Sequence, residues 1–230
     1  MPEDRPSLLS SPSQIALPLG GHPGREPRRL VIGNANAHAI DALGNPAAWP
    51  FRVAVLSGPP RSGKSLLARW AASQHSALPL VVIDNAEQAD ETELFHRWNG
   101  VQQASVPGDG TGKGALLLVV NADPANGSPW RIALPDLASR IGGSLQLQLS
   151  EPDDVMAADL LLALAEQRGL SLPVAAADYL VPRSVRSFAA LEALVAAIDR
   201  ISLERRSPAT MSVWRAALEA LQGPEQQRLL

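Results

Sequence analysis

Short runs of consecutive apolar residues recur along the first two thirds of the chain. Three of them, at 51–57, 80–83 and 115–120, are rich in β-branched and aliphatic side chains, and each is followed by glycine or a polar residue. Runs of this length without polar alternation are typical of strands buried on both faces of a parallel sheet. The segment 145–149 alternates apolar and polar residues and is predicted to be a fourth strand.

Helical patterns fill the intervals between these strands and continue after them. We predict helices at 36–43, 65–76, 91–103 and 137–141, and then at 152–168, 173–181, 184–205 and 209–221. Strands alternating with helices, followed by helices alone, indicate a parallel α/β sheet with an all-α lid. The expected parts are a flexible N-terminal arm at 1–28, an α/β domain at 29–150 and an α-helical lid domain at 151–230.

Composition narrows the classes of function. The 230 residues are 46% apolar and 19% charged, and the net charge of −3 argues against a strongly basic nucleic-acid binder. The absence of cysteine excludes a disulfide scaffold, a thiolate zinc site and cysteine catalysis. No two of the four histidines lie four residues apart, so a protein-only metal site is not expected. The charged start and short apolar runs predict a cytoplasmic protein without a membrane segment.

A phosphate-binding loop of the G-x-x-x-x-G-K-S type lies between the first predicted strand and its helix. Its predicted nucleotide-binding residues are Gly58, Pro59, Pro60, Arg61, Ser62, Gly63, Lys64, Ser65 and, at the start of the helix, Leu66. Backbone N–H groups of such a loop point at phosphate oxygens, and the helix N-terminus adds positive potential. We expect Lys64 to reach the β- and γ-phosphates of ADP or ATP and Ser65 to hold Mg²⁺.

Polar residues end the next two buried strands. Asp84 follows an apolar strand, as does a Walker B carboxylate that orients Mg²⁺, although it could instead cap the next turn. The next position is Asn85, which cannot accept a proton, so intrinsic hydrolysis should be slow or absent; Glu87 could substitute for the missing carboxylate. Asn121 ends the following strand, either beside the γ-phosphate or simply as a strand-ending residue.

Beyond these motifs, the chain resembles the AAA+ family of the replication initiator DnaA, and in particular the DnaA-related regulators of the Hda (HdaA) type. The resemblance covers roughly residues 14–220. It is carried by the segments 30–36, 56–65, 82–85, 93–96, 133–140 and 186–194. It implies the AAA+ form of the P-loop NTPase fold. Because the span from Ser65 to Asp84 is short for that family, the sheet should lack one edge strand.

The resemblance also implies roles for two arginines, Arg140 at a subunit interface and Arg186 on the lid. The segment 133–140 is similar to the family's arginine-finger box, which implies that Arg140 acts in trans on the γ-phosphate held by a neighbouring subunit. An ordinary salt-bridged helix residue is the alternative for Arg140. Arg186 begins the segment similar to the sensor 2 region and is the candidate nucleotide contact from the lid. Arg183 is close to it, and an ungapped comparison puts the family's usual position near Leu194.

The N-terminal arm contains one short apolar island. It resembles the peptide by which Hda proteins dock on the β sliding clamp, and its predicted clamp-binding residues are Gln14, Ile15, Leu17, Pro18 and Leu19. An amide followed by apolar anchors on an extended, proline-stiffened peptide suits a hydrophobic pocket. The alternative is a few apolar residues in a disordered arm.

Together, these features predict a nucleotide-binding regulator of chromosome replication initiation. It would dock on the clamp and present Arg140 to DnaA, stimulating that partner's ATP hydrolysis. DNA contact would be indirect, through the clamp, because no helix-turn-helix domain follows the lid. A stand-alone P-loop ATPase and a DNA-binding, helicase-loader-like protein are the alternatives. The sequence leaves the oligomeric state open, a homodimer included.

Overall fold

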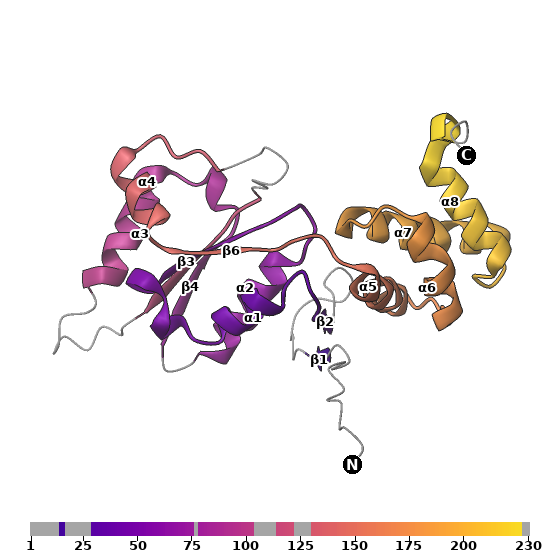
Figure 1. The fold of residues 1–230 in the computed structure, drawn as a ribbon, viewed down its shortest axis with the longest axis horizontal. Coiled ribbons are helices and arrows are strands. Elements are labelled where there is room, and N and C mark those ends of the chain that lie inside the picture. The colour runs from indigo at the N-terminus through magenta and orange to yellow at the C-terminus, as the bar shows by residue number, and fades with distance from the viewer. Residues whose placement is uncertain (1–13, 17–28, 76–77, 104–113, 122–129, 227–230) are drawn as a thin grey trace, which may run out of the picture.

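The computed structural model describes residues 14–16, 29–75, 78–103, 114–121 and 130–226 (Figure 1). The strands are β1 (Gln14–Ala16), β2 (Arg29–Val31), β3 (Val53–Ser57), β4 (Leu80–Ile83), β5 (Ala115–Val119) and β6 (Leu145–Gln148). The α-helices are α1 (Ala37–Leu43), α2 (Lys64–Gln74), α3 (Glu91–Gln103), α4 (Pro135–Gly142), α5 (Asp154–Gln167), α6 (Val174–Leu180), α7 (Phe188–Arg205) and α8 (Met211–Gln226). Short 3-10 turns occupy Pro46–Ala48, Pro50–Arg52, Ala86–Gln88 and Val181–Arg183.

Four strands form one parallel sheet in the order β4–β5–β3–β6. In the centre of the sheet, Val55 of β3 lies opposite Leu118 of β5 and Gln146 of β6. Every residue of β5 is buried, as expected for a central strand covered on both faces. The predicted α/β fold is therefore confirmed, and the alternating segment at 145–149 is a strand.

Helices cover both faces of this sheet. Ala54 and Leu56 of β3 belong to the core cluster that includes α1 and α2, whereas Val53 and Val55 belong to the cluster that includes α3 and α4. This alternation follows from the period of two along a strand. Figure 1 shows α1 and α2 on one side of the strands and α3 and α4 on the other.

The outer strand β4 follows α2 closely in the chain. The described part of the chain adds no strand beyond β4, which agrees with the expected loss of one edge strand. Val81 of β4 is accordingly 40% exposed. The result is a four-stranded sheet with β4 at one edge and β6 at the other.

The four C-terminal helices pack around a core of their own, which contains residues of α5, α6, α7 and α8. Asp153 caps α5 by accepting the N–H of Met156 at 2.9 Å. Ser187 caps α7 by accepting the N–H of Ala190 at 3.2 Å, so α7 begins at Phe188 rather than at the predicted residue 184. In addition, α8 continues to Gln226, beyond its predicted end at 221. No helix in the described ranges is long and apolar enough to cross a membrane.

A small apolar cluster joins the sheet to these helices. It contains Val31 and Ala35 from β2 and the turn after it, Met156 from α5 and Phe188 from α7. Gly33 lies close to the same place, because an added Cβ there would come within 2.7 Å of the Met156 side chain. The segment around β2 therefore packs against the lid, and residues of the phosphate-binding loop line the same pocket.

Candidate nucleotide-binding site

The phosphate-binding loop connects β3 to α2, as predicted. Gly58 begins it with φ of +153°, and an added Cβ would lie 2.9 Å from the Cβ of Leu149. Gly63 precedes the helix in the left-handed conformation, with φ of +83°. These positions need glycine because an L side chain is strained at such φ values. The loop therefore has the backbone geometry that allows N–H groups to converge on an anion.

Lys64 already points into this loop. It is 4% exposed, and its Nζ donates to the carbonyls of Gly58 at 3.0 Å and Pro59 at 2.8 Å. Ser62 is also buried, with its Oγ 3.4 Å from the same Nζ. An ammonium group held by carbonyl oxygens inside a loop is available to phosphate oxygens without a change of fold.

The remaining loop residues are more accessible. Ser65 is partly buried at the first turn of α2, and Leu66 is buried behind it. Pro59 is partly buried and Pro60 is exposed at the tip of the loop. The loop thus presents a hydroxyl at the helix start and an exposed outer rim.

The carboxyl ends of β4 and β5 bring three polar side chains together. The Nδ2 of Asn121 donates to Oδ1 of Asn85 at 2.7 Å and to Oε1 of Glu87 at 3.0 Å. Asn85 has φ of +52°, a conformation that asparagine tolerates well. Because β5 lies between β4 and β3, Asn121 lies between the phosphate-binding loop and Asp84 in the order of the sheet.

Magnesium would fit this edge only together with phosphate. Asp84 is exposed, and its Oδ1 accepts the N–H of Asn85 at 3.1 Å. The Asp84 carboxylate and the Ser65 hydroxyl are hard oxygen donors of the kind Mg²⁺ prefers. Within the described ranges, no three His, Cys, Asp or Glu side chains gather to hold a metal. A bound ion would depend on nucleotide oxygens for its other ligands.

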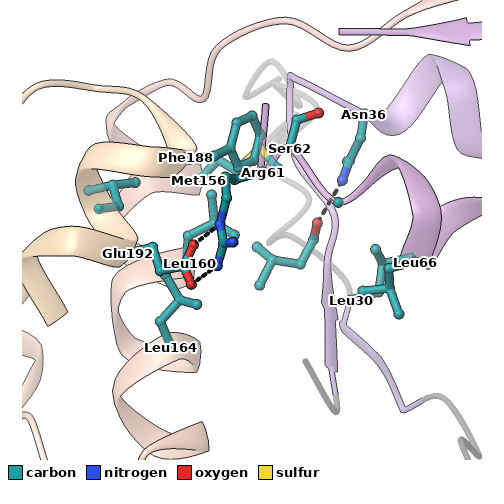
Figure 2. A pocket seen from close by; sticks show the side chains of 13 residues that line it. Leu30, Asn36, Arg61, Ser62, Leu66, Met156, Leu160, Leu164, Phe188 and Glu192 are labelled. Carbon is teal, nitrogen blue, oxygen red and sulfur yellow. Dashed lines mark hydrogen bonds and ion pairs between the residues drawn. The ribbon is translucent and has the colours of Figure 1, made fainter. Parts of the chain in front are cut away.

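A pocket of about 90 Å³ opens beside the loop, between β2 and the helical lid (Figure 2). Its lining is mostly apolar and comprises Leu30, Val31, Asn36, Arg61, Ser62, Gly63, Leu66, Met156, Leu160, Leu164, Phe188, Leu191 and Glu192. Asn36 is buried and its amide is occupied, donating to the carbonyl of Val31 at 2.8 Å and accepting the N–H of Gly33 at 3.0 Å. An apolar slot next to a phosphate-binding loop suits a nucleobase and its sugar.

One ion pair crosses this pocket. Arg61 of the loop donates from Nε and Nη2 to the two carboxylate oxygens of Glu192 on α7. The hydrogen bond and the charge of Glu192 both raise the pKa of Arg61 above its ordinary value. The predicted site residue Arg61 is thus joined to the lid rather than left free.

The lid arginines considered for sensor 2 lie elsewhere. Nε of Arg186 is 2.6 Å from Oδ1 of Asp154, and the Arg186 side chain is 55% exposed. Arg183 lies over the ring of Tyr179 at 4.2 Å and donates to the Tyr179 carbonyl at 2.9 Å. Neither arginine lines the pocket in this structure.

Arg140 lies on α4, where aromatic side chains of α3 hold it. Its guanidinium is 4.7 Å from the ring centre of Phe95 and 4.6 Å from that of Trp98, and Nη1 donates to Oδ1 of Asn99 at 2.7 Å. Figure 1 shows α3 and α4 on the side of the sheet away from the lid. Arg140 does not line the pocket beside the phosphate-binding loop of its own chain.

Glu91 fixes the approach to α4. Its carboxylate accepts the backbone N–H groups of Ala133 at 2.8 Å and Leu134 at 2.7 Å. Charge-assisted hydrogen bonds of this kind are stronger than neutral ones. The backbone that leads into the arginine-bearing helix is therefore tied to the start of α3.

The predicted clamp-binding island is described only in part. Gln14–Ala16 form β1, which pairs antiparallel with β2 so that Ile15 lies opposite Leu30. The predicted contacts Leu17, Pro18 and Leu19 lie outside the described residues, as does most of the segment 106–114. The start of the island is therefore part of a two-stranded sheet.

The lid residues that line the pocket were not predicted from the sequence. Glu192 is 131 positions from Arg61, and nothing in the local pattern around either residue links the two. Met156 and Phe188 appear in the sequence as ordinary apolar positions of helices. The one available signal was the resemblance of the segment 186–194 to sensor 2, which implies that this part of the lid faces the nucleotide.

Comparison with known proteins agrees with this architecture. Residues 154–218, from α5 into α8, match the family model described as "Hda, lid domain". The lid region therefore matches the Hda lid family, and the resemblance to DnaA-related proteins of the Hda type is confirmed. No curated protein sequence matches the chain.

Solved structures support the fold over most of the chain. Domain III of DnaA from Thermotoga maritima has a TM-score of 0.65 at 14% identity, covering 85% of this chain and 95% of that domain. RuvB of the same organism, a Holliday junction branch migration motor, has a TM-score of 0.56 at 16% identity, covering 83% and 70%. DnaA bound to AMPPCP and single-stranded DNA has a TM-score of 0.54 at 14% identity, covering 77% and 66%. At such identities the likeness establishes the fold.

Proposed function

We propose that this protein binds ADP or ATP with Mg²⁺, docks on the β sliding clamp and supplies Arg140 to stimulate ATP hydrolysis by DnaA. Such an activity would make it a negative regulator of replication initiation. The Hda-type lid supports this assignment. The nucleotide bound by this chain would act as a structural or switching ligand, with hydrolysis occurring in the partner.

The observation that carries this proposal is the position of Arg140. It lies on the α3–α4 face, apart from the pocket of its own chain, where a neighbouring AAA+ subunit could bring its nucleotide. Its contacts with Phe95, Trp98 and Asn99 would hold α4 in position against α3. These contacts would have to break before the guanidinium could extend toward a partner. A guanidinium reaching a γ-phosphate in trans can raise the hydrolysis rate by about 10³- to 10⁵-fold.

The nucleotide would be held by the residues predicted from the loop. Lys64 and the loop amides would contact phosphate, Ser65 and Asp84 would support Mg²⁺, and the slot at Phe188 would take the base. Asn121 would approach the phosphate end from β5. Arg186 could join only after leaving Asp154, because that ion pair holds it outside the pocket.

A stand-alone ATPase is the second candidate, and one contact favours it. Glu87 is held by Asn121 at the carboxyl edge of the sheet, where a carboxylate could orient water. Against it, the donor Asn121 also binds Asn85, so Glu87 is part of a fixed network. We therefore expect little turnover by the protein alone.

Hydrolysis of DnaA-bound ATP tests the proposal. The assay combines this protein, clamp-loaded DNA and DnaA–ATP, and omits each component in turn. We expect full activity only in the complete mixture. The Arg140→Ala substitution should reduce the stimulated hydrolysis rate about 10³-fold. Arg131→Ala is the matched control, because Arg131 is an exposed arginine close by in the chain.

Three outcomes of that assay would contradict the proposal. The first is an Arg140→Ala protein that folds, binds the clamp and still stimulates DnaA, which would remove the finger role. The second is brisk hydrolysis by the protein alone that disappears in a Glu87→Gln variant, which would establish the stand-alone ATPase instead. The third is stimulation that does not depend on the clamp, which would overturn the docking role of the N-terminal island.

A further inference from the structure

The lid contacts the phosphate-binding loop through a carboxylate. Figure 2 shows Glu192 on α7 reaching Arg61 across the pocket, with both carboxylate oxygens engaged by the guanidinium. The Glu192 side chain is 25% exposed, whereas that of Arg61 is 60% exposed. Arg61 also has φ of +66°, which is costly for a residue with a Cβ. The loop has this conformation while the Arg61 side chain is paired with Glu192 of the lid.

Among the lid residues that the structure describes, none that lines the pocket carries a positive charge to balance this carboxylate. Of the lid residues that line the pocket, Glu192 is the charged one, and the others are apolar. Arg186 is paired with Asp154, and Arg183 is stacked on Tyr179. The side of the pocket formed by the lid is therefore negative next to a loop whose geometry favours anions.

Phosphate and Glu192 are competitors for the same guanidinium. A nucleotide phosphate on the loop would lie near Arg61 and, like a carboxylate, would accept two hydrogen bonds from it. Once Arg61 turned to phosphate, the Glu192 carboxylate would lose its partner and lie beside further negative charge. Like charges in a partly buried site repel one another, so the carboxylate would be driven away.

We propose that Glu192 makes the lid respond negatively to phosphate: its bridge to Arg61 closes the lid in the empty protein, and a bound nucleotide phosphate breaks that bridge. This inference rests on the nucleotide site of the proposed function. The effect of Glu192 is opposite to that of a lid arginine, because phosphate would attract an arginine toward the loop. Glu192 then lowers affinity in proportion to ligand charge, and the freed lid helix α7 signals that the loop is occupied.

Calorimetric titration with a charge series tests the first consequence. The ligands are adenosine, pyrophosphate, ADP and ATP, and the proteins are wild type, Glu192→Gln and Asp199→Asn. Asp199 is the matched control, because it is a lid carboxylate on α7, 26% exposed and paired with Arg168 at 3.9 Å outside the pocket. We expect Glu192→Gln to tighten ADP and pyrophosphate by roughly two- to fivefold and ATP by more, and to leave adenosine unchanged.

Spin-label distances test the bridge without relying on affinity. The chain has no cysteine, so labels can be attached at Ala47→Cys in the sheet part and Leu203→Cys on α7, both exposed positions. The wild-type distance distribution should be narrow without ligand and should shift or broaden with pyrophosphate. In the Glu192→Gln background it should already be broad without ligand.

The two measurements separate this inference from the nucleotide site itself. Equal effects of Glu192→Gln on adenosine and ATP, or weaker ATP binding, would overturn the role of Glu192 while leaving the site intact. An unchanged distance distribution in ligand-free Glu192→Gln would do the same. Failure of wild type to bind any of the four ligands would overturn the nucleotide site and this inference together.

Discussion

At the scale of single residues, Gly58 and Gly63 separate two costs of building the phosphate-binding loop. Both have positive φ, but an added Cβ at Gly58 meets Leu149, whereas at Gly63 it meets nothing within 4 Å. Gly58→Ala therefore combines backbone strain with a clash at the end of β6, and should lower the free energy of unfolding by about 2–4 kcal/mol. Gly63→Ala should cost about 1 kcal/mol from strain alone. Urea denaturation measures both, and equal losses would contradict the geometry.

The loop residues were predictable because their chemistry is local. The spacing of Gly58, Gly63, Lys64 and Ser65 predicts both the backbone conformation and the charge, and the structure has this loop between β3 and α2 as expected. Glu192 was not predictable in this way. Its role arises from the packing of α7 against the loop, and a glutamate on an exposed helix face looks the same in sequence whether or not an arginine lies opposite.

At the scale of elements, the N-terminal island begins with β1, which pairs with β2 and is also part of the predicted clamp-binding peptide. Its first residues pair with β2, and docking on a clamp would need the same peptide in an extended form within another protein's pocket. We therefore predict that β1 must leave β2 before the clamp binds. Ala16 and Arg29 are opposite Cα partners, so Ala16→Cys with Arg29→Cys should form a disulfide in this cysteine-free chain.

Clamp affinity of that double variant measures the competition. Oxidation should weaken binding by about tenfold or more, which corresponds to at least 1.4 kcal/mol, and reduction should restore it. Each single cysteine variant is the control, because it cannot close the internal bond. If the oxidised and reduced proteins bind equally well, then either β1 docks while attached to β2 or the island is not the docking peptide.

Element boundaries show where the pattern of apolar residues stops being sufficient. The bounds of the strands were predicted within a residue or two because runs such as Ala115–Val119 have few alternatives, but β4 is partly exposed rather than buried as predicted. The start of α7 was predicted too early, because residues 184–187 continue the apolar and polar rhythm. The structure uses the Ser187 side chain as a cap, preceded by the turn Val181–Arg183. Capping depends on backbone direction, which periodicity does not report.

At the scale of the whole molecule, a small apolar joint connects the sheet part to the lid. The sheet part has two buried clusters and the lid has one, and the joint between them contains Val31, Ala35, Met156 and Phe188. Phe188 is 7% exposed and also lines the pocket proposed to bind nucleotide. The same side chain should therefore set both the cooperativity of unfolding and the affinity for nucleotide, because ligand and joint occupy one place.

Phe188→Ala tests this coupling. Removal of a buried phenylalanine costs about 3–5 kcal/mol, and here the loss falls on the joint between the sheet part and the lid. We expect tryptophan fluorescence and far-ultraviolet circular dichroism to report separate unfolding midpoints, and ADP to bind more weakly. Leu203→Ala on the same helix is the control, because Leu203 is 71% exposed and should change neither property. Coincident transitions with unchanged ADP affinity would mean that contacts other than Phe188 join the lid to the sheet.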